Sequence, residues 1–232
     1  MSDKTHLMNR RTFLAMAGGV TVLGLSSAAL GQSLTPEEIL ALSDEDLTDH
    51  LRNQFAPSDT ILRPGADVVV AFGDSLTQGF GVNRRMTYPA QFGKMVGMDI
   101  INAGRNGETS RQALSRIEPM LRRYKPTWVI ICIGGNDLLR GLPPEVMREN
   151  IGMMISSIRG AGAHPVVIAI PRPGDQEDHP AYEQVAEKFR VPVLFGLGRR
   201  LDPSRHFLQD GIHPNADGYT IIAEALVEFF RP

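Results

Sequence analysis

Residues 67–77 read DVVVAFGDSLT, a stretch in which an apolar run leads directly into Gly-Asp-Ser. The apolar, β-branched run 67–72 predicts a buried strand, which Gly73-Asp74-Ser75 ends abruptly. A strand, a tight turn and then a serine can raise a hydroxyl at the edge of a parallel sheet, where a base and oxyanion donors can reach it. The stretch alone also fits an ordinary strand with an Asp/Ser turn, so other parts of the chain must decide.

Length and composition favour one globular domain with additional segments. The chain has 232 residues, 42% hydrophobic and 22% charged, with a net charge of −2. This charge gives no sign of a nucleic-acid or anionic-lipid surface. The single cysteine, Cys132, excludes an intramolecular disulfide, and its apolar neighbours predict a buried core thiol and not a nucleophile.

The first 31 residues have the composition of a targeting segment and are left out of the fold. Arg10 and Arg11 precede an apolar, small-residue stretch, an arrangement that resembles a twin-arginine export signal. Cleavage after Gly31 would leave Gln32 as the new N-terminus; a retained membrane anchor is the alternative. We therefore expect a periplasmic or secreted protein that uses the twin-arginine translocation machinery, with no stable membrane insertion of the mature form.

Residues 32–66 form a polar helical preamble. Thr35-Pro36-Glu37-Glu38 has the pattern of a capping box with proline at the first helical position, and a second start signal follows at Ser43. The pattern predicts two short helices and an irregular link that pack on the surface of the domain that follows.

From residue 67 onward the pattern alternates between strands and helices. The expected strands are 67–72, 98–102, 127–133, 165–170 and 191–195, and the expected helices are 88–97, 109–124, 143–159, 182–189 and 216–230. Such alternation predicts an α/β fold, a three-layer doubly wound sandwich in which helices cover both faces of a five-stranded parallel sheet. Ligands bind such sheets beyond the carboxyl ends of the strands, so residues that follow strands are the candidates.

Polar motifs follow three of these strands, and a fourth motif precedes the last helix. Gly73-Asp74-Ser75-Leu76-Thr77 follows the first strand, and a turn with Gly104 follows the second. Gly134-Gly135-Asn136-Asp137 follows the third, and Asp210-Gly211-Ile212-His213-Pro214 comes before the final helix. An aspartate three residues before a histidine can accept from one ring nitrogen and leave the other free as a base.

These four motifs, in this order, resemble those of the SGNH (GDSL) hydrolases, over roughly residues 66–231. The sequence around Tyr88 and Gly107 is most similar to the arylesterase, thioesterase I and lysophospholipase branch of this family. The resemblance implies an SGNH hydrolase domain over 67–232 with a flavodoxin-like sheet. It also implies that Ser75 is the nucleophile, His213 the base and Asp210 its orienting partner. The Ser75 and Gly104 N–H groups and the Asn136 side chain would form the oxyanion hole.

Other classes of site fit the sequence less well. The α/β-hydrolase elbow lies in mid-chain with a second glycine, where this sequence has Thr77, and no Gly-x-Gly-x-x-Gly follows a strand. Asp175, Glu177, Asp178 and His179 lie in a proline-bounded polar loop that is better explained as solvated, and His206 lies in a loop as well. We therefore expect no metal, no cofactor and no nucleic-acid partner.

The sequence thus predicts an exported serine ester hydrolase that forms an acyl-enzyme. A lysophospholipase or thioesterase for longer chains and an O-acetylesterase on envelope polysaccharide use the same chemistry and stay open. A non-catalytic envelope-binding domain on the same fold is an alternative from another class, because a fold does not fix a function.

The sequence further predicts a short acyl group. Residues 171–180, after the fourth strand, contain no aliphatic or aromatic side chain besides prolines. Apolar surface is what makes each additional methylene of an acyl chain favourable, so a polar cover favours acetyl to butyryl groups on aryl or sugar alcohols. The competing hypothesis is a longer groove lined by Phe80, Met86 and Leu138.

Overall fold

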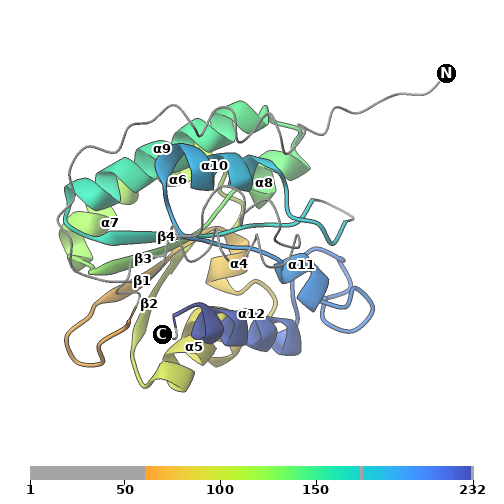
Figure 1. Ribbon diagram of the computed structural model, residues 1–232. Helices are drawn as coiled ribbons and strands as arrows, with labels where there is room; N and C mark the ends of the chain where they lie inside the picture. The colour runs from red at the N-terminus through yellow and green to blue at the C-terminus, as the bar shows by residue number, and fades with distance from the viewer. Residues whose placement is uncertain (1–60, 173–174, 231–232) are drawn as a thin grey trace, which may run out of the picture. The chain divides into compact units, whose positions relative to one another are not determined.

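Five parallel strands form one sheet in the middle of the described structure (Figure 1). The strands are β1 (Val69–Gly73), β2 (Ile100–Gly104), β3 (Trp128–Cys132), β4 (His164–Ile168) and β5 (Val193–Leu194), and they lie in the order β2-β1-β3-β4-β5. The computed structural model describes residues 61–172 and 175–230. The predicted α/β fold with a five-stranded parallel sheet is confirmed, and every strand overlaps its expected range.

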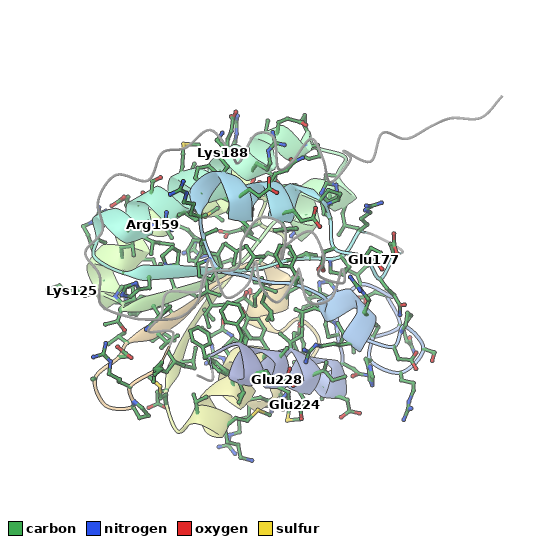
Figure 2. All side chains as sticks on the ribbon, viewed as in Figure 1. Lys125, Arg159, Glu177, Lys188, Glu224 and Glu228 are labelled. Carbon is green, nitrogen blue, oxygen red and sulfur yellow. The ribbon has the colours of Figure 1, made fainter. Side chains whose placement is uncertain are left out.

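Helices cover both faces of this sheet, as Figure 1 shows. On one face lie α6 (Ser110–Leu114), α7 (Ile117–Tyr124), α9 (Pro144–Gly160) and α10 (Ala181–Phe189), and on the other α5 (Tyr88–Val96) packs against α12 (Ala216–Phe229). Strands β1 and β3 are buried along their whole length, which explains why both read as continuous apolar runs. Charged side chains such as Lys125 and Glu224 point outward from the helices and loops (Figure 2).

The order of the strands determines where a ligand site can lie. The chain steps from β1 to β2 on one side and then returns to β3 on the other side of β1. A crevice opens beyond the carboxyl ends of the strands at such a reversal, and ligands bind there in doubly wound sheets. Ser75 follows β1 and Asn136 follows β3, so both residues lie beside this reversal.

The helix expected over 109–124 is two helices, α6 and α7, separated at Ser115 and Arg116. Pro119 explains the break, because a proline in the interior of one long helix would remove an N–H donor and clash with the carbonyl of Ser115. In the observed structure Pro119 falls in the first turn of α7, where the N–H groups have no partner within the helix. The prediction of a single helix was therefore wrong.

Four short helices were not predicted: α4 (Ser75–Gln78), the 3-10 helix η1 (Arg84–Met86), α8 (Gly135–Leu139) and α11 (Leu197–Arg200). Each has at most five residues, which is too few to show a helical period in the sequence. Two of them, α4 and α8, carry Ser75 and Asn136, so these short helices shape the site.

The predicted export signal (1–31) and most of the helical preamble (32–66) lie outside the described residues. Their boundaries with the domain at 67–232 stay predictions. Within the described ranges, no helix combines the length and the apolar character needed to span a membrane.

Gly73 ends β1 at a position that has no room for a side chain, so a larger residue there should destabilise the protein. A Cβ at Gly73 would collide with the Cys132 carbonyl oxygen on β3 and with the Thr77 hydroxyl on α4. We predict that Gly73→Ala lowers the free energy of unfolding by about 1–3 kcal/mol through overpacking, measured by urea denaturation. Gly160→Ala is the control, because a Cβ there meets open space at the end of α9. Equal effects of the two substitutions would contradict this explanation.

Candidate active site

The turn after β1 presents Ser75 at the first position of α4. Asp74 is the N-cap of this helix, and its Oδ1 accepts a hydrogen bond from the Leu76 N–H at 3.0 Å. Gly79, with a φ of 84°, ends the helix after a single turn. The Ser75 hydroxyl is therefore held at the carboxyl end of β1 by a capped turn and not by a flexible loop.

His213 lies between Ser75 and Asp210. Its Nε2 is 2.9 Å from the Ser75 Oγ, and its Nδ1 is 2.7 Å from the Asp210 Oδ2. The Asp210 carboxylate can only accept at Nδ1, so Nδ1 carries the proton and Nε2 offers a lone pair to the serine hydroxyl. The Phe80 ring packs against the imidazole with 4.5 Å between the ring centroids. The structure thus brings together Ser75, His213 and Asp210, which lie up to 138 residues apart in the chain.

The local backbone keeps the Asp210 carboxylate ionised. Burial acts to raise the pKa of Asp210, but hydrogen bonds from the backbone N–H and the ring of His213, and from the Ile212 N–H, outweigh it and lower the pKa to about 2. The two backbone donors lie 2.9 Å (Ile212) and 3.0 Å (His213) from Oδ1. The carboxylate is therefore both charged and fixed in orientation.

Two residues of the pocket carry backbone N–H groups without a partner among the described residues. The residues that carry them, Ser75 and Gly107, line the pocket, and neither N–H donates a hydrogen bond to another described residue. Gly107 has a φ of 73°, in the left-handed region that favours glycine, at the tip of the turn between β2 and α6. These two N–H groups are available to an oxyanion.

The prediction that Gly104 supplies an oxyanion donor is wrong. The Gly104 N–H donates to the Asn102 Oδ1 at 3.0 Å, and Gly104 is not among the residues that line the pocket. A Cβ at Gly104 would collide with the backbone of Thr77 and Gln78, so this glycine lets β2 approach α4 closely. Asn106-Gly107 is itself a turn signal in the sequence, and it could have directed the assignment to Gly107.

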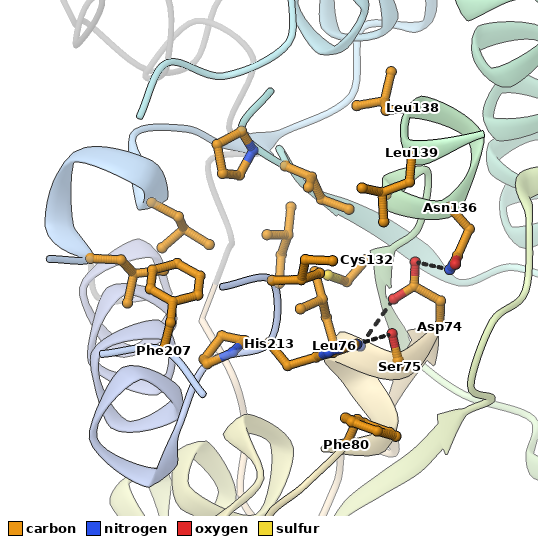
Figure 3. Close-up of a pocket in the computed structure, with 18 of the residues that line it drawn as sticks. Asp74, Ser75, Leu76, Phe80, Cys132, Asn136, Leu138, Leu139, Phe207 and His213 are labelled. Carbon is orange, nitrogen blue, oxygen red and sulfur yellow. Dashed lines mark hydrogen bonds between the residues drawn. The ribbon is translucent and has the colours of Figure 1, made fainter. Parts of the chain in front are cut away.

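Asn136 lines the same pocket, as expected, but its amide already has partners. The Asn136 Nδ2 donates to the Glu108 carbonyl oxygen at 3.0 Å and to the Asp74 Oδ2 at 3.3 Å, the second bond being drawn in Figure 3. The next residue, Asp137, is buried and accepts from the Ser110 N–H at 2.7 Å and from the Ser110 hydroxyl at 2.6 Å. These bonds fix α8, and with it Asn136, against α6.

Asp74 is a buried carboxyl directly behind the site. Its burial raises the pKa of Asp74 to about 7, although hydrogen bonds from the Leu76 N–H and the Asn136 amide act in the opposite direction. The side chains of Asp137 and Glu108 add to the increase. Asp74 is therefore a weaker acid than an exposed aspartate, and it contacts both α4 and Asn136.

A cavity of about 420 Å³ opens over these groups (Figure 3). One wing is apolar and extends from the serine toward α11 and α12; its wall consists of Leu76, Ile168, Leu197, Leu201, Phe207 and Ile222. Leu138 and Leu139 line the opposite side, and the volume is in the range of small-molecule sites. Cys132 is buried in the wall, as predicted for a core thiol, and burial raises its pKa well above the usual range.

The polar loop weighed as a metal site has other contacts. The Asp175 Oδ1 accepts from the Gln176 and Glu177 N–H groups, and the His179 Nδ1 accepts from the Ala181 N–H. Over the residues that the structure describes, no three His, Cys, Asp or Glu side chains lie together as ligands for a metal ion.

Comparison with known proteins identifies the family of this chain. Residues 71–221 match the model of the GDSL-like lipase/acylhydrolase family. The Escherichia coli K12 protein named thioesterase 1/protease 1/lysophospholipase L1 is 29% identical over 192 residues, covering 79% of this chain and 92% of the relative. An arylesterase from Vibrio mimicus is 29% identical over 175 residues, or 70% of this chain and 88% of the relative.

A solved structure shows the same architecture. The crystal structure of TesA superposes with a TM-score of 0.65 at 26% sequence identity, covering 71% of this chain and 98% of that one. The match of the family model, which spans more than half of the chain, shows the relationship expected from the four motifs. The chain belongs to the GDSL-like lipase/acylhydrolase family, the SGNH hydrolases, and is with them a hydrolase of ester bonds.

Proposed function

We propose that this protein hydrolyses carboxylic esters through Ser75, His213 and Asp210, and that its preferred acyl group is longer than butyryl. The observation that carries the chemistry is the continuous chain of hydrogen bonds from the Ser75 hydroxyl through His213 to Asp210. The observation that carries the acyl length is the apolar wing of the cavity.

The mechanism follows from these positions. The Ser75 Oγ attacks the ester carbonyl carbon while the His213 Nε2 takes the hydroxyl proton, and Asp210 stabilises the imidazolium. His213 then gives the proton to the leaving alcohol, and an acyl-enzyme ester remains on Ser75. Water, deprotonated by the same Nε2, attacks the acyl carbonyl carbon. The bond between this carbon and the Ser75 Oγ then breaks, the acid leaves, and His213 returns the proton to the Ser75 Oγ. The three side chains that move the protons, Ser75, His213 and Asp210, already lie within hydrogen-bond distance of one another.

Three donors stabilise the oxyanion in this proposal: the N–H groups of Ser75 and Gly107 and the amide of Asn136. The planar amide of Asn136 rotates as a unit in this step, gives up its bond to Asp74 and donates that hydrogen to the oxyanion. The bond to Asp74 is the longer one, at 3.3 Å, so a fully charged oxygen can replace it.

The apolar wing supports an acyl group longer than the short one expected from the sequence. That expectation rested on residues 171–180, but the described part of this segment supplies only some of the lining, with Pro171, Arg172, Asp175 and Gln176. The apolar walls come from α4, β4, α11, α12 and the loop before His213. Of the three residues considered for a longer groove, Phe80 and Leu138 line the cavity and Met86 does not.

We also propose that residues 1–31 export the protein through the twin-arginine route to the periplasm or the medium. Arg10 and Arg11 before the apolar stretch support this proposal. In such a location the substrate is an ester available outside the cytoplasm, such as a lipid or aryl ester.

The catalytic assignment predicts the behaviour of Ser75→Ala. This variant should lose ester hydrolysis and labelling by a fluorophosphonate probe, because both need the Ser75 oxygen. Its circular dichroism spectrum and thermal midpoint should stay close to those of the wild type. Hydrolysis of p-nitrophenyl esters near the wild-type rate would contradict the mechanism, and an unreactive wild-type protein would favour the binding-domain alternative.

The acyl-length proposal predicts the profile across p-nitrophenyl esters of two to twelve acyl carbons. A methylene buried in the apolar wing is worth about 0.8 kcal/mol, so kcat/KM should rise by up to about fourfold per methylene beyond butyryl until the wing is full. Leu201→Trp, which fills the wing, should move the optimum to shorter chains. Leu142→Trp is the control, because Leu142 is exposed and does not line the cavity. A wild-type optimum at two to four carbons would restore the short-acyl prediction.

The export proposal predicts that replacing Arg10 and Arg11 by lysines strands unprocessed precursor inside the cell. Twin-arginine export depends on the arginine pair, whereas the lysine pair keeps the charge. Cell fractionation with immunoblotting of both forms measures the effect. Unchanged export of the lysine form would reject this route.

A further inference from the structure

Arg116 lies where the carboxyl ends of two strands meet, and its guanidinium is almost completely enclosed. Its NH1 donates to the Ala103 carbonyl oxygen of β2 at 2.7 Å, and its NH2 donates to the Gly73 carbonyl oxygen of β1 at 2.8 Å. Its Nε is 2.6 Å from the Glu108 carboxylate, and the two side chains are 12% and 13% exposed. The guanidinium also lies 4.1 Å above the Phe72 ring. Each of the three nitrogens of this cation therefore has an acceptor, and one face of it has an aromatic contact.

The partners of Arg116 belong to the segments that carry or hold the oxyanion donors of the proposed mechanism. Gly73 is two residues before Ser75, so the bond to its carbonyl holds the start of the turn that presents the Ser75 N–H. Glu108 follows Gly107, so the bond to its carboxylate holds the turn that presents the Gly107 N–H. The Glu108 carbonyl oxygen in turn accepts the hydrogen bond from Asn136. One side chain is thus connected to all three donors.

The break between α6 and α7 makes this connection possible. Arg116 is the N-cap residue of α7, with a φ of −111° and a ψ of 4°, outside the regular helix. A planar guanidinium can donate in several fixed directions at once, whereas an ammonium group is a single point of charge. A lysine would therefore keep the charge opposite Glu108 but could not hold both strand ends and the carboxylate in one geometry.

We propose that Arg116, together with Glu108, is the positioning pair of the oxyanion hole: it sets the relative placement of the Ser75, Gly107 and Asn136 donors and so the rate of the chemical step. Arg116 does not line the substrate cavity, so it acts through the groups that it holds and not on the substrate. Displacement of a catalytic group by about 1 Å can cost on the order of 10²-fold in rate. The inference rests on the proposed function, because it assigns a role within the same reaction.

Arg116→Lys tests the role in a protein that keeps the buried charge opposite Glu108. On p-nitrophenyl butyrate we expect kcat to fall by roughly 10- to 100-fold with KM within about twofold, because transition-state stabilisation is lost and ground-state binding is not. Circular dichroism and thermal unfolding verify that the variant is folded. Arg116→Met combined with Glu108→Gln, which leaves no unpaired carboxylate, should show the same kcat loss.

Arg159→Met is the matched control. Arg159 also holds two backbone carbonyl oxygens, those of Phe189 and Arg190, each at 2.8 Å, but at the end of α9 that lies beside the amino ends of the strands. Loss of this arginine should leave kcat unchanged. Equal kcat losses at the two positions would assign Arg116 a general stabilising role and overturn the proposal.

A double-mutant cycle with Asn136→Ala separates positioning from mere stability. If Arg116 acts through the oxyanion hole, Arg116→Lys should cost much less in kcat when the Asn136 donor is already absent. The positioning role would be rejected if the fold-losses in kcat of the two single variants simply multiply in the double variant. A folded Arg116→Lys variant with the wild-type kcat would also reject it. The wild-type rate is the reference for all of these variants. If the wild-type protein shows no turnover that depends on Ser75, the proposed function is wrong, and this outcome is distinct from failure of the positioning role.

Discussion

The register of the parallel sheet is the constraint on which the site depends. Gly73 pairs with Gly104 on one side and with Cys132 on the other, so three neighbouring strands end at the same level. The turns that follow β1, β2 and β3 therefore begin side by side, and they carry Ser75, Gly107 and Asn136. Because parallel strands share one direction, every such turn opens at the same edge of the sheet. A slip of one residue in β1 would move Ser75 away from both neighbouring turns and turn its side chain toward the other face.

The groups behind this edge are polar and buried, and hydrogen bonds make their burial tolerable. Asp137 receives two bonds from Ser110, and Asn150 donates to the same serine at 2.9 Å. Arg116 is enclosed by Glu108 and two strand-end carbonyls. A buried polar group without a partner would cost several kcal/mol, so these networks admit few alternative arrangements. That rigidity is what a preorganised oxyanion hole requires.

Much of the fold and most of the site could be predicted from the sequence. The strands were recognisable because burial on both faces leaves continuous apolar runs in β1 and β3, and helices such as α9 and α12 are long enough to show a period. Ser75, Asn136, Asp210 and His213 were recognisable because they lie in three of the four ordered motifs. Two expectations were wrong for physical reasons: Pro119 ends the helix expected over 109–124, and the Gly104 N–H is taken by Asn102, which leaves Gly107 to face the pocket.

The sequence by itself determined the class of sheet, the family and the residue types of the chemistry, because these depend on local pattern and on motifs a few residues long. Only the tertiary structure decided which backbone N–H is free, which residues line the cavity and what Arg116 holds. The apolar wing combines Leu76 with Phe207 and Ile222, which no sequence spacing relates. The reason is that cavity shape and hydrogen-bond partners arise from contacts between distant segments, and these contacts exist only once the strands have paired in register and the helices have packed on them.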